Sequence, residues 1–224
     1  MPYAPVWELQ RRLHELRRAQ KIPDILISLE HEPVITLGRS AQAQDLVAPK
    51  EELVKKGVEV FSVERGGGAT YHGPGQLVLY PIVDLRALNF SVRQYVWALE
   101  EVMIRVGKDF GVELFRRPGF PGVWHTLGKV GFLGIYVRNW VTMHGLALNV
   151  ALNPNGFAWI VPCGISDLSV ISLSDILGQA VSVEEAENYA LSAFSEVFSR
   201  ELVKISGTEV KEWLSRHGLE WRSA

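Results

Sequence analysis

Cysteine is the scarcest reactive residue of this chain, because Cys163 is the only one among 224 residues. A single thiol can form neither an internal disulfide nor a multi-thiolate zinc site, which favours the reducing cytosol as the compartment. The six histidines include no helical i, i+4 pair and no Cys/His cluster, so no metal site is expected. The purpose of the one thiol is therefore the first question that the sequence poses.

Long apolar runs and an excess of one charge are missing too. No stretch approaches the roughly 18 unbroken apolar residues that cross a bilayer. Arginines recur at positions 11, 12, 17 and 18, where a secretory signal would have an apolar core. The 23 basic and 25 acidic residues leave a formal net charge of −2, without the basic excess of a nucleic-acid binder. We expect a soluble protein that binds neither nucleic acid nor membrane.

The apolar pattern alternates between helical and strand spacing along the chain. Helical periodicity and capping signals predict helices over residues 6–18, 49–57, 91–110, 182–203 and 208–216. Short apolar runs predict strands over residues 24–30, 33–38, 58–64, 76–85, 121–125, 129–138, 141–150 and 157–162, with a bulge or an edge position at Pro81. This mixture favours an α/β (α+β) fold with a mixed sheet flanked by helices. We expect one domain over residues 1–224, with a helical segment or a small subdomain from about residue 180.

A glycine-rich stretch spans residues 65–75. Its glycines let the backbone adopt positive φ and approach a ligand closely. It is not a Walker loop, since both Gly-Lys pairs of the chain lack the following Ser or Thr, and Tyr71 occupies a position where a dinucleotide fingerprint needs a small residue. Arg65, Thr70 and His72 add hydrogen-bond donors, which suits a loop around a substrate. A tight connection between two strands is the alternative.

Cys163 stands between Pro162 and Gly164, where an apolar run ends. Nucleophiles are often placed at such turns, because the backbone is rigid there and the side chain projects outward. A free thiol has a pKa of about 8.5, so a nucleophilic cysteine needs a basic or positive neighbour. The alternative is an inert, buried cysteine.

The candidate neighbours of the thiol are His72, His125, His144 and Lys129. A histidine would give a dyad of the protease type. Lys129 lies in an apolar, glycine-containing run that resembles a strand, where partial burial would lower its pKa and couple its titration to that of a nearby thiol. Alternatively, Lys129 extends from a strand end to water.

Four segments, taken together, carry a resemblance to a known family. They are Arg65-Gly-Gly-Gly-Ala-Thr-Tyr-His-Gly-Pro-Gly-Gln-Leu-Val78, Gly128-Lys-Val-Gly131, His144-Gly-Leu-Ala-Leu-Asn149 and Pro162-Cys-Gly-Ile165. In this order and spacing they resemble the lipoyl(octanoyl) transferases, also called lipoate-protein ligase B. The resemblance extends over roughly residues 30–175.

This resemblance implies the fold of the lipoate and biotin protein ligases and a transfer of an octanoyl group without a cofactor. The implied donor is octanoyl-acyl carrier protein. The implied acceptors are lysines on lipoyl domains of 2-oxoacid dehydrogenase E2 subunits and on the glycine cleavage H protein. Cys163 would carry the acyl group as a thioester, with Lys129 as its activating partner. The implied substrate site consists of Arg65, Gly66, Gly67, Gly68, Ala69, Thr70, Tyr71, His72, Phe132, Leu133, Gly134, His144, Gly145, Leu146 and Ala147.

Three other functions remain open at this stage. An ATP-dependent lipoate or biotin ligase on the same fold would form an acyl-adenylate and need no cysteine. A thioesterase would use water in place of the acceptor lysine. A non-catalytic acyl-binding module would form no covalent adduct.

Overall fold

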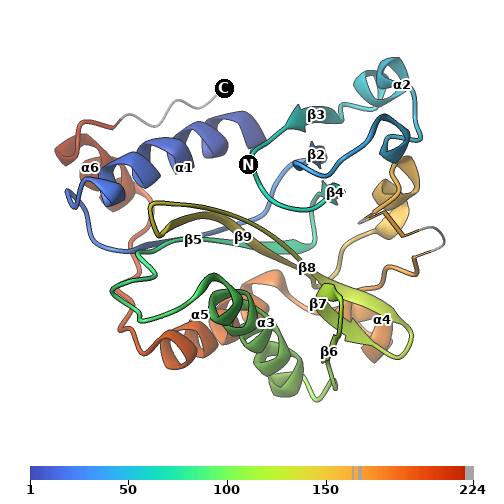
Figure 1. Ribbon diagram of the computed structural model, residues 1–224. Coiled ribbons are helices and arrows are strands. Elements are labelled where there is room, and N and C mark those ends of the chain that lie inside the picture. The colour runs from blue at the N-terminus through green and yellow to red at the C-terminus, as the bar shows by residue number, and fades with distance from the viewer. Residues whose placement is uncertain (163, 166–167, 220–224) are drawn as a thin grey trace.

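The centre of the computed structural model, which describes residues 1–162, 164–165 and 168–219, is a six-stranded sheet (Figure 1). Its order is β1-β5-β9-β8-β7-β6, and all neighbouring strands run antiparallel. The strands are β1 (Ile25–Leu29), β5 (Gln76–Ile82), β6 (Phe115–Arg117), β7 (Phe120–His125), β8 (Gly128–Arg138) and β9 (Val141–Asn149). Strands β8 and β9 form a long hairpin at the middle of this sheet.

A smaller sheet packs against one face of the large one. In it, β2 (Val34–Leu37) runs parallel to β3 (Glu59–Ser62) and antiparallel to β4 (Ala69–His72). Residues from both sheets, among them Ile35, Tyr71 and Phe132, share one apolar cluster. The predicted fold class is confirmed, and the only parallel strand pair between the named strands of the described chain lies in this small sheet.

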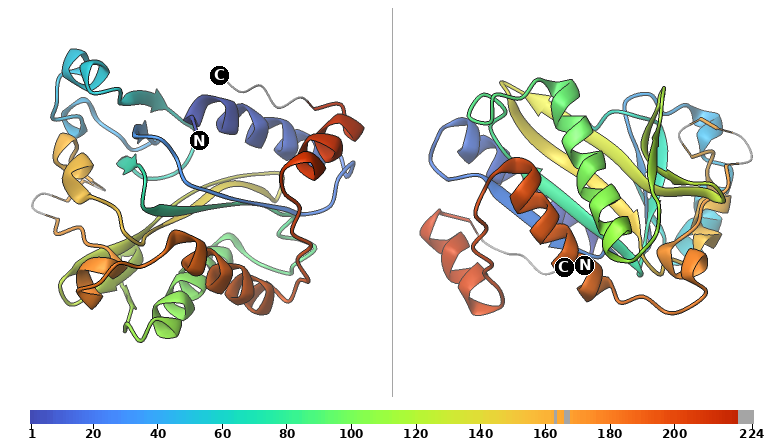
Figure 2. Two further views of the ribbon diagram at one scale, coloured as in Figure 1. Left: turned by 180° about the vertical axis from the view of Figure 1, so that it is seen from behind. Right: turned by 90° about the horizontal axis from the view of Figure 1, so that it is seen from below.

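Helices cover both faces of the large sheet (Figures 1 and 2). On the face that carries the small sheet lie α1 (Tyr3–Arg18) and α6 (Thr208–Arg216). On the other face lie α3 (Val92–Asp109) and α5 (Val183–Phe198), whose apolar residues join one core with the sheet. The remaining elements are α2 (Lys50–Lys55), α4 (Leu173–Leu177) and the 3₁₀ segments η1 (Ala43–Asp45) and η2 (Pro154–Trp159).

Helix α3 begins and ends where its sequence predicts. The Ser91 hydroxyl accepts a hydrogen bond from the N–H of Gln94, and the Gln94 side chain accepts from the N–H of Ser91, which satisfies two otherwise unpaired donors. After Asp109, Gly111 adopts φ +73° and ends the helix. Tyr95, Leu99 and Val102, among other residues, form the buried stripe of α3.

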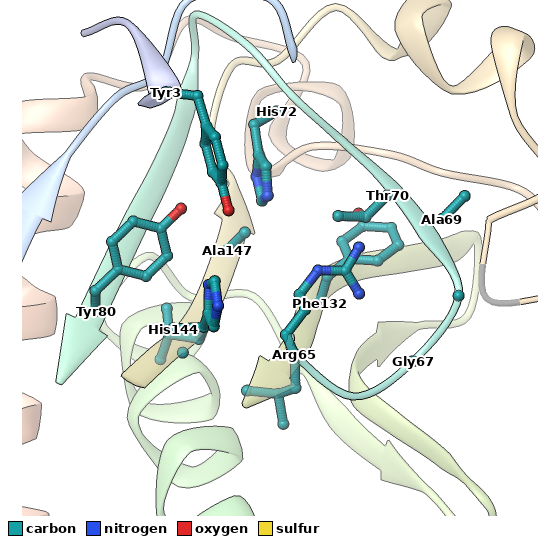
Figure 3. Close-up of a pocket in the computed structure, with 15 residues that line it drawn as sticks. Tyr3, Arg65, Gly67, Ala69, Thr70, His72, Tyr80, Phe132, His144 and Ala147 are labelled. Carbon is teal, nitrogen blue, oxygen red and sulfur yellow. The ribbon is translucent and has the colours of Figure 1, made fainter. Parts of the chain in front are cut away.

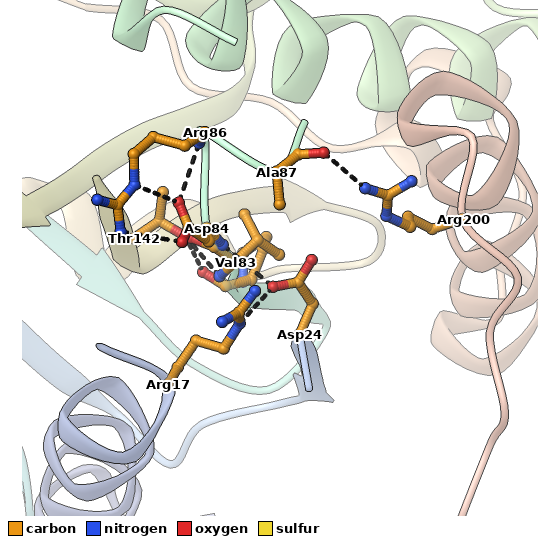
Figure 4. Close-up of polar contacts among 9 residues, drawn as sticks. Arg17, Asp24, Val83, Asp84, Arg86, Ala87, Thr142 and Arg200 are labelled. Atoms are coloured by element: carbon orange, nitrogen blue, oxygen red, sulfur yellow. Dashed lines mark hydrogen bonds and ion pairs between the residues drawn. The ribbon is translucent and has the colours of Figure 1, made fainter. Parts of the chain in front are cut away.

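A set of polar contacts ties α1 to the chain that leaves β5 (Figure 4). Arg17 of α1 lies 2.7 Å from Asp24, and Asp24 accepts the N–H of Asp84 at 3.1 Å. Asp84 in turn forms an ion pair with Arg86. Arg200, just after α5, donates to the carbonyl of Ala87 at 3.0 Å, so α1 and the end of α5 are both attached to this segment.

Pro81 lies in the interior of the sheet, and the edge alternative is wrong. The ladder between β5 and β9 stops at Leu79–Leu146 and is resumed by the Asp84–Val141 bridge, so the irregularity expected at Pro81 is a gap in the ladder. The cause is that proline has no N–H to donate to the facing strand. On β9, the N–H of His144 donates instead to the side chain of Gln10 at 2.9 Å.

Three other expectations are corrected. Residues 157–162 are not a strand: Phe157–Trp159 belong to η2, and only Ile160 and Pro162 make isolated bridges. Part of the glycine-rich stretch, Ala69–His72, is strand β4 rather than loop. Helix α5 ends at Phe198 instead of near residue 203, because Ser199 adopts the left-handed conformation. The short elements β6 and α4 were not predicted.

Candidate active site

A narrow cavity lies between the two sheets, beside the N-terminal end of α1 (Figure 3). Its space is about 490 Å³, including the part that opens to solvent. Most of its lining consists of apolar side chains and glycine backbone from the segment after β3, from β4, and from the β8–β9 hairpin. The residues lining it are Tyr3, Arg65, Gly67, Gly68, Ala69, Thr70, His72, Tyr80, Phe132, Leu133, Gly134, His144, Gly145, Leu146 and Ala147.

The cavity brings together the substrate-site residues expected from the sequence, with two exceptions. Gly66 donates its N–H to the carbonyl of Ile135, and Tyr71 packs edge-on against Phe157 and Trp159 outside the lining. Two lining residues, Tyr3 and Tyr80, were not expected. Strand β5 is buried along its whole length, so the sequence carries no alternation that would single out Tyr80.

Arg65 holds the loop that precedes β4. Its guanidinium donates to the carbonyl and hydroxyl oxygens of Thr36 at 2.6 and 2.9 Å, and to the carbonyl of Gly66 at 3.0 Å. A Cβ at Gly134 would lie 2.7 Å from Cδ of Arg65, so only glycine leaves room for this side chain. A buried arginine with these contacts fixes the cavity wall and brings a positive charge to it.

Histidines and tyrosines close one end of the cavity, where Figure 3 shows Tyr3, His72, Tyr80 and His144 together. Nε2 of His31 lies 2.9 Å from the hydroxyl of Tyr80, and Nδ1 of His72 lies 2.6 Å from Oε1 of Gln76. Burial lowers the pKa of His31 to about 4 and that of His72 to about 3. At neutral pH, His72 therefore lacks the positive charge that a thiolate partner would need.

His144 lines the same end in an unusual backbone conformation, with φ +59°. Its Nε2 lies 3.6 Å from Oε2 of Glu64, and Glu64 also accepts a hydrogen bond from the Trp7 indole at 3.0 Å. Burial raises the pKa of Glu64, but the contacts with His144 and Trp7 outweigh it and hold that pKa at about 2. Burial lowers the pKa of His144, while the nearby Glu64 carboxylate opposes this effect.

Lys129 is the second residue of β8 and is only 2% exposed, so its side chain does not extend to water. Its Nζ donates to the carbonyl of Pro121 at 2.9 Å. The ammonium group also lies 5.1 Å from the ring centre of Trp124 and 4.8 Å from that of Phe132, which lines the cavity. Lys129 is not itself a lining residue of the cavity, but it contacts Phe132, which is.

Cys163 lies outside the described residues, but the chain on both sides of it is anchored near the cavity. Pro162 forms a parallel bridge with Ala69 of β4, a lining residue. Val170 forms a parallel bridge with Lys129, whose N–H donates to the carbonyl of Ser169 at 2.8 Å. The described residues on either side of the thiol thus contact the cavity lining at Ala69 and the lysine itself.

His125 is the remaining candidate neighbour of the thiol. It is the last residue of β7, is partly exposed, and its Nδ1 accepts the N–H of Leu127 at 3.3 Å.

Within residues 1–162, 164–165 and 168–219, no group of three or more His, Cys, Asp or Glu could hold a metal ion. No helix in the same part of the chain is long and apolar enough to cross a membrane.

Solved structures share this arrangement of sheets and helices. A bipartite lipoate protein ligase of Thermoplasma acidophilum superimposes with a TM-score of 0.68, covering 93% of this chain and 86% of that one at 18% identity. A lipoate-protein ligase A bound with ATP gives a TM-score of 0.68 over 93% of this chain and 88% of that one, at 17% identity. The fold is therefore that of the lipoate-protein ligases.

The sequence comparisons define the family. The family described as the lipoyl protein ligase A/B catalytic domain matches residues 2–195, and this chain belongs to it. An octanoyltransferase of Caldicellulosiruptor saccharolyticus is 42% identical over 94% of this chain and 90% of its own length. An octanoyltransferase of Syntrophotalea carbinolica is 46% identical over 84% of this chain and 85% of its own length. The resemblance to the lipoyl(octanoyl) transferases is confirmed.

Proposed function

We propose that this protein is an octanoyltransferase that moves an octanoyl group from octanoyl-acyl carrier protein to the acceptor lysine of lipoyl domains. The reaction is the first step of endogenous protein lipoylation. Octanoyltransferases that are 39% and 46% identical to this chain over most of its length support the activity. The single cysteine favours the reducing cytosol as the place of the reaction.

The observation that carries the proposal is a buried lysine beside a narrow apolar cavity. Lys129 has little access to water. Pro162, which precedes Cys163, bridges to Ala69 of β4, and Val170, which follows it, bridges to Lys129 of β8. A positive charge near a thiol favours the thiolate, which is the nucleophilic form. This arrangement suits a cysteine that exchanges acyl groups.

The chemistry has two steps and needs no energy source. The Cys163 thiolate attacks the carbonyl of the donor thioester, and the carrier thiol leaves with a proton from the Lys129 ammonium. The acceptor amine then attacks the Cys163 thioester and passes a proton to the neutral Lys129 amine. Departure of the Cys163 thiolate leaves a stable amide and restores the ion pair. Such a sequence predicts ping-pong kinetics.

The cavity can hold the acyl chain and supply a hydrogen-bond donor for its carbonyl. Thr70 lines the cavity, and its hydroxyl is buried without a hydrogen-bond partner among the described residues. Figure 3 shows Thr70 and Phe132 at the opposite end of the cavity from Tyr80. A carbonyl near Thr70 would place the acyl tail toward Tyr80 and His144. A donor directed at the developing oxyanion would stabilise the transition state.

The product of the reaction tests the function. We expect incubation with octanoyl-acyl carrier protein and a lipoyl domain, without ATP, to give an octanoylated lipoyl domain. A lipoyl domain whose acceptor lysine is replaced by arginine is the control and should remain unmodified. Strict dependence on ATP would favour a ligase of the adenylating type, and release of free octanoate alone would favour a thioesterase.

A further inference from the structure

One peptide group lies between a buried acid and the buried lysine. The carbonyl oxygen of Pro121 accepts the hydrogen bond from Nζ of Lys129 at 2.9 Å. The N–H of Gly122, which belongs to the same peptide group, donates to Oε1 of Glu100 at 3.0 Å. A trans peptide is planar, with its carbonyl and its N–H pointing in opposite directions. Glu100 and Lys129 therefore hold opposite sides of one rigid unit.

Residue 122 has to be glycine for this contact to exist. Gly122 adopts φ +113°, which side-chain-bearing residues rarely adopt. A Cβ there would lie 2.2 Å from the carbonyl oxygen of Gly131 and 3.0 Å from Cε of Lys129. The β7 backbone at Gly122 therefore lies directly against the lysine side chain, just before the register shift between Val123 and Trp124.

Glu100 is an unusual residue for its place on α3. It is 6% exposed and points from the buried side of the helix toward β7. Its second oxygen, Oε2, lies 3.2 Å from Nε of Arg116 on β6. Burial of a carboxylate is unfavourable unless its partners compensate for the lost contact with water. Both oxygens of Glu100 are used, one by Arg116 and the other by the peptide that faces Lys129.

We propose that Glu100 is a positioning residue for Lys129, acting through the Pro121–Gly122 peptide. This inference rests on the proposed function, in which Lys129 activates the Cys163 thiol. The lysine side chain has four flexible methylene groups, so holding its ammonium group in one place costs rotamer entropy. A carbonyl that Glu100 holds in one orientation gives the ammonium group a fixed acceptor. A displacement of about 1 Å at a reacting group can reduce a rate roughly 100-fold, so this support matters for transfer.

The single cysteine allows a direct test that needs no substrate. Alkylation by iodoacetamide reports on Cys163 alone, because it is the only cysteine of the chain. The rate follows the thiolate fraction, so its pH dependence gives the pKa of the thiol. We would compare the wild type with Lys129→Met, Glu100→Met, Glu100→Gln and Glu101→Met. The last is a matched control, since Glu101 also pairs with Arg116 but makes no hydrogen bond to the Pro121–Gly122 peptide.

We expect alkylation at pH 7 to slow about tenfold in Lys129→Met, which corresponds to a thiol pKa about one unit higher. Glu100→Met keeps the side-chain volume but loses the acceptor for the N–H of Gly122. It should raise the thiol pKa by less than Lys129→Met does and slow alkylation at least about threefold. Glu100→Gln can still accept the N–H of Gly122, so it should restore the rate to within a factor of about two. Glu101→Met should match the wild type. Transfer assays should show the same order in kcat, with little change in KM for the octanoyl donor.

The possible failures are distinct. If Lys129→Met alkylates like the wild type at every pH, the pairing of Lys129 with Cys163 is wrong, and the positioning role is wrong with it. If Lys129→Met is slow but Glu100→Met behaves like the wild type, only the role of Glu100 is overturned. Should Glu100→Met not fold, Glu100→Asp replaces it. The shorter acid keeps the charge near Arg116 but does not reach Gly122, and a wild-type profile for it would equally overturn the proposal.

Discussion

His31 and His72 determine how the residues around the cavity respond to acid. Burial lowers the pKa of His31 to about 4 and that of His72 to about 3, whereas a histidine in an unfolded chain titrates near 6.5. Between these values the unfolded state binds more protons than the native state. The contribution of both residues to the free energy of unfolding is therefore complete above about pH 6.5 and is lost as the pH falls toward 4.

We expect the free energy of unfolding to decrease between pH 6.5 and 5, by up to about 1.4 kcal/mol per pH unit for each of the two histidines. In His31→Gln the amide can still bond to the Tyr80 hydroxyl, but one titrating group is gone, so the dependence should be shallower. Urea unfolding at pH 7, 6 and 5 measures both slopes. Equal slopes for the two proteins would show that His31 does not titrate as described.

At the scale of elements, the docking of α1 depends on a gap in the sheet. Pro81 interrupts the ladder between β5 and β9, and Gln10 of α1 accepts the backbone N–H of His144 that the strand leaves unpaired. The same helix carries Tyr3 into the cavity lining and Trp7 onto Glu64. Helix α1 is therefore part of the wall of the site, although it is far from the glycine-rich segment in sequence.

Gln10→Leu tests this connection. The substitution leaves the N–H of His144 buried without its acceptor, and such a loss costs about 1–3 kcal/mol of stability. Thermal or urea unfolding should show that decrease, and octanoyl transfer should weaken because His144 lines the cavity. Arg12→Ala on the exposed face of the same helix is the control and should change stability by less than about 0.5 kcal/mol. Equal stability for Gln10→Leu and the control would contradict this account of α1.

Elements with local signals could be predicted from the sequence, and those set by tertiary contacts could not. Ser91 and Gly111 predict both ends of α3 because the cap and the left-handed residue act within a few positions. Residues 157–162 are apolar without alternation, which does not distinguish a strand from η2 and the bridges that replace one. Helix α5 ends at a left-handed serine, Ser199, for which the sequence gives no warning.

At the scale of the whole molecule, α5 belongs to the main core rather than to a separate unit. Phe194 and Phe198 stack at 4.1 Å, and Phe198 also contacts Phe90 and Tyr95 at the start of α3. Ala186 and Ala190 lie in the same apolar cluster as the strands of the large sheet. Helix α5 therefore stabilises the face of the sheet opposite the cavity.

Phe198→Ala should lower the free energy of unfolding by about 3–5 kcal/mol, because it removes a buried aromatic ring and leaves a cavity. Circular dichroism and tryptophan fluorescence should report one common transition at the lower stability. Val203→Ala is the matched control, since Val203 is 85% exposed and its truncation should be nearly neutral. Separate transitions for the two probes would contradict a single core that includes α5.

The candidate site could be predicted in part. Its motifs are contiguous in the sequence, but other residues around it come from distant segments that only the fold brings together. Composition and the family resemblance single out residues 65–72 and 144–147 in the sequence. The structure places most of these residues around one cavity. Tyr3 and Tyr80 come from segments without such signals. The contact from Glu100 to Gly122 requires α3 to pack beside β7, which no local pattern encodes.

The most direct test of the account is whether Cys163 carries the octanoyl group. Intact-mass spectrometry after incubation with octanoyl-acyl carrier protein, in the absence of a lipoyl domain, measures this. The account predicts a gain of one octanoyl group, its absence in Cys163→Ala, and its loss from the wild type when a lipoyl domain is added. No gain in mass, or a gain that persists in Cys163→Ala, would contradict it.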